Sequence, residues 1–453
     1  MTDSSLLMAY YADDFTGSTD ALEVLEGQGM RTVLFIQPPT KERMDAFPGV
    51  HCVGVAGTAR TMSPSVMEEE LAPLLLQLKQ LRPKMLHYKM CSTADSSPEI
   101  GSIGKVIELG KELYRDQGAI PVLVAAPQLK RYTVYGNHYA GYRDQIYRLD
   151  RHPSMSTHPV TPMMEADLLR HFSEQMKGTI SLYSVTELEL PADERQARWA
   201  SSLQREKHAI LFDAINEEHT RAIGQLLGSA GEQQPMFAVG SSGLSLSLAS
   251  YWKEKYALES RVEQRLEAKQ TLVLSGSCSP ITNMQIHEAV ENGFRKLKVD
   301  VLELLDEKKS EAVCERLLHE VKKLWREGSS LILYTADGPE DESIMLLHEE
   351  LKRRGERVSS TGQLIGGTLG EIGKRLVEGL GIERLVLAGG DTSGFAALSM
   401  GIDALELVQR TAPGAPLCRG YSRDRAVDRI EIALKGGQLG QPDYFMRVAS
   451  GGK

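Results

Sequence analysis

The chain has 453 residues, of which 42% are hydrophobic and 25% charged, a composition that excludes a disordered protein. The formal net charge is −9 and no basic tract stands out, so we expect no nucleic-acid partner. No run of about 18 apolar residues predicts a membrane span, and we expect no membrane partner. The length suits two or three domains.

Cysteine usage and the first residues indicate the compartment. The five cysteines are odd in number and none are spaced like metal ligands, which predicts neither a disulfide framework nor a zinc site: Cys52, Cys91, Cys278, Cys314 and Cys418. The opening MTDSSLLMAYYADD lacks a basic region, and its apolar stretch is too short for a signal peptide. We therefore expect a cytoplasmic protein.

Short β-rich runs alternate with amphipathic stretches through the first 240 residues. Strands are expected at 5–12, 31–36, 51–56, 84–90, 119–126, 179–185, 208–214 and 235–240. Helical patterns such as SVMEEELAPLLLQLKQL at 65–81 and KVIELGKELYRDQG at 105–118 separate them. Continuous apolar strands that alternate with helices predict a mainly parallel sheet.

Residues 127–163 interrupt this alternation. They are rich in Tyr, His, Arg, Pro and Gly and show little periodicity. Segments of this length without regular structure are usually functional or disordered, and the aromatic content argues against disorder. We interpret the segment as an ordered excursion beside the site rather than a solvated flap. Its histidines, His138, His152 and His158, are expected at the surface.

A polar stretch with a helical pattern, 253–270, predicts a connector to a second α/β series. Strands are expected there at 271–276, 296–304, 329–336, 384–390, 404–410 and 428–437. The predicted fold class is therefore α/β, with two domains, 1–260 and 270–453. Each would have a mainly parallel sheet flanked by helices.

Three loops of the second half place small residues directly after predicted strands: SGSCSPIT at 275–282, LAGGDTSG at 387–394 and ALKGGQLG at 433–440. Glycine lets backbone N–H groups approach a phosphate, and a following helix N-terminus adds donors. Each loop alone could be a tight turn, with Ser277, Ser279, Thr392 or Ser393 as helix caps. Together they favour a nucleotide phosphate site. No Walker A or G-x-G-x-x-G pattern is present.

Two adjacent acids, Asp13 and Asp14, follow the first predicted strand. They could cap the next helix, or one could bind substrate hydroxyls or act as a base. An aspartyl phosphatase would need a second acid two residues after its nucleophile, but those positions hold Phe15 and Thr16. An aspartyl phosphatase is therefore disfavoured.

A second polar cluster, KMCSTADSSPEIGSIG at 89–104, follows the strand at 84–90, with a helix expected from Pro98. Lys89 would suit a carboxylate, and Asp95 with the serines would suit hydroxyls, although helix capping explains some of the serines. Arg60 follows another strand and is a further candidate. Cys91 is disfavoured as a nucleophile because no histidine lies at a telling position.

Read together, ADDFTGSTDAL, KMCSTADSSPEIGSIG, SGSCSPIT, LAGGDTSG, PGAPLC and LKGGQLG resemble, in order, the motifs of the four-carbon acid sugar kinase family. The resemblance implies an N-terminal substrate domain and a C-terminal ATP-binding domain. It implies substrate contacts by Asp13, Asp14, Arg60, Lys89, Ser92, Asp95 and Ser96, with His158 kept as a further candidate. It implies ATP contacts by Ser277, Ser279, Gly389, Gly390, Asp391, Thr392, Gly436 and Gly437.

The chain departs from the family pattern where substrate contacts are expected. Ala94 replaces a common Phe or Leu, Ser-Pro-Glu-Ile-Gly-Ser-Ile-Gly replaces a common Arg-Gly-Asn turn, and 148–163 is long and basic. The resemblance therefore leaves tetronates, 3-oxo-tetronates and the branched 3-oxo-isoapionate open as substrates.

The expected reaction is phosphoryl transfer from ATP, bridged by Mg²⁺, to a terminal hydroxyl of a small sugar acid. Asp14 or Asp13 is the expected base and Asp391 the rival, while no residue is assigned to the metal. A non-catalytic sugar-acid sensor that binds ATP is the alternative. Whether the chain forms a homo-oligomer stays open.

Overall fold

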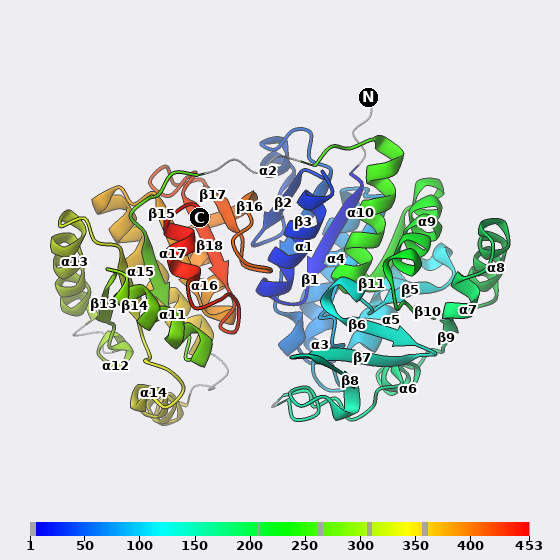
Figure 1. Ribbon diagram of the computed structural model, residues 1–453, viewed down its shortest axis with the longest axis horizontal. Helices are drawn as coiled ribbons and strands as arrows, with labels where there is room; N and C mark the ends of the chain where they lie inside the picture. Colours follow the sequence, from blue (N-terminus) through cyan, green and yellow to red (C-terminus); the bar gives the residue numbers. More distant parts are fainter. Residues whose placement is uncertain are drawn as a thin grey trace. The chain divides into compact units, whose positions relative to one another are not determined.

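The computed structural model describes residues 6–158, 160–206, 208–260, 266–305, 310–355 and 361–452, without the side chains of residues 304, 310 and 391. The chain divides into two compact units (Figure 1). Unit 1 comprises Met1–Val33 and Gln37–Arg261, and unit 2 comprises Leu34–Ile36 and Val262–Lys453. The prediction of a two-domain α/β fold is confirmed.

Unit 1 contains a sheet in the order β2-β3-β1-β4-β11-β5-β10-β9. Its strands are β1 Met8–Ala12, β2 Thr32–Phe35, β3 Cys52–Ala56, β4 Met85–Lys89, β5 Ile120–Leu123, β9 Ile180–Tyr183, β10 Ala209–Phe212 and β11 Met236–Gly240. From β3 to β9 each neighbouring pair is parallel. Apart from β9, the strands are buried along their whole length, as their continuous apolar sequences require. The parallel arrangement brings the carboxyl ends of β1, β3 and β4 to one edge.

Helices flank this sheet. The longer ones are α1 Phe15–Gly27, α5 Ile103–Leu113, α8 Ala192–Arg205, α9 Glu217–Gln233 and α10 Ser242–Tyr256. α10 packs on both α1 and α9, and α5 packs on β5 and β11. The shorter ones are α2 Lys41–Asp45, α3 Pro64–Val66, α4 Ala72–Gln80, α6 Leu168–Ser173 and α7 Val185–Leu188.

Three helix predictions need correction. The pattern at 65–81 is broken by a π-helical turn, Met67–Leu71, just before Pro73, which lacks a backbone N–H. The helix expected from Pro98 begins only at Ile103, where the Ser102 hydroxyl accepts from Lys105 N. The described part of the 253–270 connector is not helical beyond Tyr256, and Ala257 ends α10 in a left-handed conformation.

The excursion at 127–163 contains a three-stranded antiparallel sheet, β6 Arg131–Val134, β7 Asn137–Tyr142 and β8 Gln145–Arg148. The expectation of order is confirmed for its described residues, although the sequence pattern did not reveal the strands. The surface expectation was wrong for His138 and His152, which are 0% and 4% exposed. His158 is partly exposed.

Unit 2 contains strands in the order β13-β14-β12-β15-β18-β17-β16. They are β12 Leu272–Ser275, β13 Arg295–Lys298, β14 Leu331–Tyr334, β15 Arg384–Ala388, β16 Ile402–Gln409, β17 Leu417–Ser422 and β18 Glu431–Lys435. The pairs from β13 to β18 are parallel, whereas β17, which was not predicted, is antiparallel to both neighbours. Leu34 and Phe35 of this unit pair with β16.

The helices of unit 2 are α11 Pro280–Glu291, α12 Val301–Leu305, α13 Ser310–Arg326, α14 Glu342–Arg353, α15 Thr361–Leu380, α16 Gly390–Ser399 and α17 Tyr444–Ala449. The strand expected at 296–304 was too long, because it gives way to α12. The Asp300 carboxylate accepts from Leu302 N and Glu303 N, and this local cap overrides the β-branched pattern.

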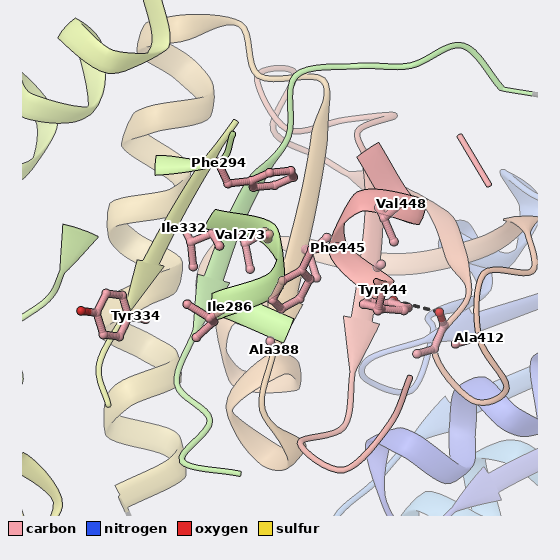
Figure 2. Close-up of a cluster of buried hydrophobic side chains, with 14 of the residues drawn as sticks. Val273, Ile286, Phe294, Ile332, Tyr334, Ala388, Ala412, Tyr444, Phe445 and Val448 are labelled. Carbon is pink, nitrogen blue, oxygen red and sulfur yellow. Dashed lines mark hydrogen bonds between the residues drawn. The ribbon is translucent and has the colours of Figure 1, made fainter. Parts of the chain in front are cut away.

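A buried apolar cluster packs helices of unit 2 against its strands (Figure 2). Val273, Ile332 and Ala388 come from β12, β14 and β15, and Ile286 of α11 and Phe445 of α17 pack over them. The cluster therefore holds α11 against the sheet at the point where the loop after β12 leads into it.

Candidate active site

Arg60 links three of the predicted carboxylates at the carboxyl edge of the unit 1 sheet. It lies in the 3-10 helix Ala59–Thr61, after β3. Its Nη2 and Nε donate to the two carboxylate oxygens of Asp13 at 2.8 and 3.3 Å. Its Nη1 lies 2.8 Å from Asp14 Oδ2, and its Nε lies 4.0 Å from Asp95 Oδ2. All three guanidinium nitrogens are thus committed to carboxylates of the protein.

Asp13 and Asp14 differ in access. Asp14 caps α1, and its Oδ1 accepts from Gly17 N at 2.6 Å. Its side chain is 22% exposed, against 4% for Asp13. Burial raises the pKa of Asp13 against the opposing effect of Arg60, and the Asp14 charge adds to the rise. Asp14 is therefore the carboxylate of the pair that a ligand can reach.

Gly17 packs closely against the carboxylate of Asp14 and the ammonium group of Lys89. A Cβ at this glycine would lie 2.6 Å from Asp14 Oδ1, 3.1 Å from Lys89 Nζ and 3.8 Å from Asp13 Oδ1. Lys89 ends β4, and its Nζ lies 3.4 Å from Asp20 Oδ2. The Asp14 carboxylate and the Lys89 ammonium group, whose side chain is 4% exposed, thus both lie against Gly17. Sequence reasoning missed both Gly17 and Asp20.

Asp95 is held by its neighbours in the second motif. Its Oδ1 accepts from the Thr93 hydroxyl at 2.7 Å. Burial raises its pKa, but Arg60 and Thr93 outweigh that effect, so the pKa lies below its ordinary value. Burial raises the pKa of the neighbouring Cys91 thiol to about 12, which argues further against a cysteine nucleophile. Ala94, which lies between Cys91 and Asp95 in the sequence, is buried with φ +53°, a conformation uncommon for a residue other than glycine.

Other predicted substrate residues have different surroundings. The Ser96 hydroxyl donates to Ala94 O at 2.9 Å and accepts from Gln175 Nε2 at 2.9 Å, while Gln175 Oε1 accepts from Ile103 N at 2.8 Å. Ser96 therefore connects the second motif to the start of α5. His158 Nδ1 contacts Thr161, and no described contact brings His158 to the Arg60 cluster.

The excursion reaches this site through His138. Its Nε2 donates to Ser92 O at 2.9 Å, which leaves Nδ1 as the acceptor for the Thr133 hydroxyl, also at 2.9 Å. Burial lowers the pKa of His138 to about 3, so the ring is neutral and this tautomer is fixed. The buried ring holds the backbone at Ser92, and its low exposure distinguishes it from the surface residue that was expected.

In unit 2, two of the glycine loops meet. A Cβ at Gly437 would lie 2.9 Å from Ser277 Oγ and 3.2 Å from Ser279 Cβ, so only glycine fits there. The Ser279 hydroxyl caps α11 by accepting from Ile281 N at 3.2 Å. The capping interpretation is therefore correct for Ser279.

The remaining glycine loop, 387–394, adjoins the loop at 275–282. A Cβ at Gly276 would lie 2.4 Å from Thr392 Cγ2. The residue that caps α16 is Gly389, with φ +136°, so the N-cap position suggested for Thr392 and Ser393 was wrong. No side chain caps α16, and a Cβ at Gly390 would meet no atom within 4 Å. This helix start suits an anion. The side chain of Asp391 lies outside the described part.

Lys435, at the end of β18, links these loops and was missed by sequence reasoning. Its Nζ donates to Thr282 Oγ1 and Gly436 O at 2.9 Å and to Gly437 O at 3.1 Å. The Ser277 hydroxyl also donates to Thr282 Oγ1, at 3.0 Å. The lysine directly precedes Gly436 and Gly437, and this adjacency is the signal that could have found it.

A cavity of about 260 Å³ opens beside Gly276 and Thr392. Val301, Ile344, Leu347 and Ile365 line it with apolar atoms, and Asp300 and His348 add polar groups. A small, mainly apolar cavity next to the glycine loops has the character of a nucleobase pocket. Its lining comes from separate helices, so no single motif marks it.

No described helix is long and apolar enough to cross a membrane. Among the described residues, no three His, Cys, Asp or Glu side chains are grouped to hold a metal ion.

Comparison with known proteins gives the family. Residues 8–248 match the model of the sugar-binding N-terminal domain, and residues 272–445 match that of the nucleotide-binding C-terminal domain. The chain is 38% identical to the 3-oxo-isoapionate kinase of Paraburkholderia graminis over 99% of this chain and 95% of that protein. It is 27% identical to the 3-oxo-tetronate kinase of Pectobacterium atrosepticum over 96% of this chain and 97% of that protein.

Solved structures agree on the fold. A Salmonella typhimurium LT2 protein, described as a candidate tRNA synthase, is 26% identical with a TM-score of 0.77 over 97% of this chain and 98% of that one. The family models and the curated kinases confirm the prediction of a sugar-acid kinase, and the chain belongs to the four-carbon acid sugar kinase family.

Proposed function

We propose that the protein transfers the terminal phosphoryl group of ATP to a terminal hydroxyl of a small sugar acid, with the branched 3-oxo-isoapionate as the first acid to test. The kinase proposal rests on one observation, namely that the Asp14 carboxylate and the Lys89 ammonium group lie against the same glycine in unit 1 while unit 2 carries adjoining glycine loops. The choice of acid rests on identity, because the chain shares 38% of residues with a 3-oxo-isoapionate kinase and 27% with a 3-oxo-tetronate kinase.

Unit 1 is the proposed sugar-acid domain. Asp14 is the proposed general base, because a base must touch its substrate and Asp14 is the exposed member of the pair. Asp13 binds Arg60 with both oxygens and so positions it. Arg60 pairs with Asp13 and Asp14, and Lys89, at the end of β4, is the cation proposed for the negative charge of the substrate. Asp95 and Ser92 are proposed to contact hydroxyls.

Unit 2 is the proposed ATP domain. The phosphates would lie against the loops that contain Ser277, Ser279, Gly390, Gly436 and Gly437, where backbone N–H groups can donate to them. The base would occupy the cavity beside Gly276 and Thr392. Asp391 stays a proposal as the rival acid.

Mg²⁺ fits this arrangement as an ion held mainly by nucleotide phosphates. Mg²⁺ in phosphoryl-transfer sites typically takes one or two carboxylates, with phosphates and water as its other ligands. When bound, the ion supplies neutralisation of phosphate charge.

An ADP-release assay over a panel of acids tests the proposal. The panel contains 3-oxo-isoapionate, 3-oxo-tetronate, threonate and erythronate, with ATP alone as the control. We expect acid-dependent ADP release, highest kcat/KM for 3-oxo-isoapionate, and a phosphorylated acid by mass spectrometry. ATP binding without ADP release for any acid would favour the sensor instead.

The five cysteines supply support for the expected compartment. All five are free thiols, which suits the reducing cytoplasm that we propose for this protein.

A further inference from the structure

Lys435 is a buried cation without an acidic partner among the side chains that the structure describes. It is 0% exposed, and its three ammonium hydrogens match three acceptors, Thr282 Oγ1, Gly436 O and Gly437 O. Burial lowers its pKa to about 7. An unpaired buried charge is costly, so its presence at a ligand loop calls for a reason beyond packing.

The two carbonyls do not need the lysine to be satisfied. Gly436 O also accepts from Leu439 N at 3.1 Å. Gly437 O also accepts from the Thr282 hydroxyl at 2.9 Å. The ammonium group instead fixes the direction of two successive carbonyls, because both accept from the same nitrogen.

The geometry of the peptide bond also fixes the direction of the N–H groups that follow these two carbonyls. In a planar trans peptide, the C=O and the N–H point in opposite directions. Gly436 O shares its peptide with Gly437 N, and Gly437 O shares its peptide with Gln438 N. Both N–H groups therefore point away from Lys435, and in the described part of the chain neither donates to a protein acceptor. Successive outward N–H groups form an anion-binding concavity.

We propose that Lys435 is a positioning residue that turns the N–H groups of Gly437 and Gln438 toward a phosphate group of the nucleotide. This inference rests on the proposed use of ATP. Because all three ammonium hydrogens are occupied inside the protein, the lysine acts through the loop and does not itself touch the phosphate. Thr282, which accepts from both Lys435 and Ser277, extends the same constraint to the loop before α11.

Titration calorimetry with ATP and with adenosine, in the full chain, tests the proposal. Lys435→Met keeps the length of the side chain and removes the charge. We expect ATP affinity to fall about 10- to 100-fold, as for lost charge-assisted hydrogen bonds, with adenosine affinity changed by less than about twofold. Lys374→Met, which removes a surface lysine paired with Asp424, is the matched control and should bind ATP like the parent.

The outcomes distinguish failure of the positioning role of Lys435 from failure of the proposed use of ATP. If the parent binds ATP and Lys435→Met binds it within about twofold of the parent, the positioning role is wrong and the proposed function stands. An equal loss of ATP and adenosine affinity would also overturn it, since that indicates general disruption. If the parent binds no ATP, both fail together. Should Lys435→Met not fold, Thr282→Val must show the same selective loss of ATP affinity for the proposal to survive.

Discussion

Asp14→Asn separates helix capping from catalysis, because it keeps the cap and removes the base. Asn and Asp are about equal as N-cap residues, so the amide oxygen can still accept from Gly17 N. The variant loses a charge beside the helix N-terminus, worth about 0.3–1 kcal/mol. It also loses the ion pair with Arg60, 2.8 Å long, worth about 1 kcal/mol at this partial exposure. We expect the free energy of unfolding to fall by only about 1–2 kcal/mol.

The expected loss of turnover is far larger. General base catalysis contributes about 10²- to 10⁴-fold, so kcat should fall by that factor, equivalent to about 3–5 kcal/mol of activation free energy. ATP affinity by calorimetry should not change. Asp167→Asn is the matched control, because Asp167 also caps a helix, α6, and pairs with an arginine, Arg170, away from the cluster. A folded Asp14→Asn protein with kcat within about tenfold of the parent would show that Asp14 only caps α1.

Three further changes test the surroundings of this base and of Lys435. Gly17→Ala would normally favour a helix by about 1 kcal/mol. Its Cβ would lie 2.6 Å from Asp14 Oδ1, however, so we expect kcat/KM to fall without a rise in Tm. The control is Gly367→Ala, whose Cβ would meet no atom within 4 Å and which should raise Tm and keep activity. Lys89→Met should raise KM for the sugar acid about 10- to 100-fold and leave ATP affinity unchanged; an unchanged KM in steady-state assays would exclude Lys89 from the acid site. Because burial lowers the pKa of Lys435 from 10.5 to about 7, the unfolded chain binds more protons between these pH values, and stability rises with pH there. Urea unfolding should therefore show the parent gaining about 2 kcal/mol relative to Lys435→Met between pH 7 and pH 9, and a pH-independent difference would contradict this.

Much of the fold could be predicted because buried parallel strands have continuous apolar sequences. All eight strands expected in the first 240 residues are present. The strands at 131–148 were hidden because Tyr, Arg and Gly residues there are only partly buried, so no alternation marks them. At 301–305, the Asp300 cap selects a helix despite a strand-like pattern.

The grouping of polar side chains could be predicted where motif residues lie directly at strand ends, as for Asp13, Asp14 and Lys89. The role of a side chain could not be predicted where it contacts other parts of the protein, as Ser96 does when it accepts from Gln175. Contacts between distant segments were equally hidden, and Lys435 meets a hydroxyl 153 residues away. Sequence patterns report local periodicity, and these roles depend on long-range packing.

The contacts of Arg60 suggest a different role from the one that its position in the sequence predicted. Its position after β3 suggested a substrate contact, yet Asp13 and Asp14 occupy its guanidinium. Removing the arginine would leave Asp13, which is 3% exposed, as a buried carboxylate without its closest cation, an effect that costs several kcal/mol. Loss of activity in an Arg60 variant would therefore report on the order of the cluster. Lys89 lies against Gly17 and pairs with Asp20 at 3.4 Å, and its replacement leaves the pair of Asp13 and Arg60 in place, so it is the sharper test of the proposed contact with the sugar acid.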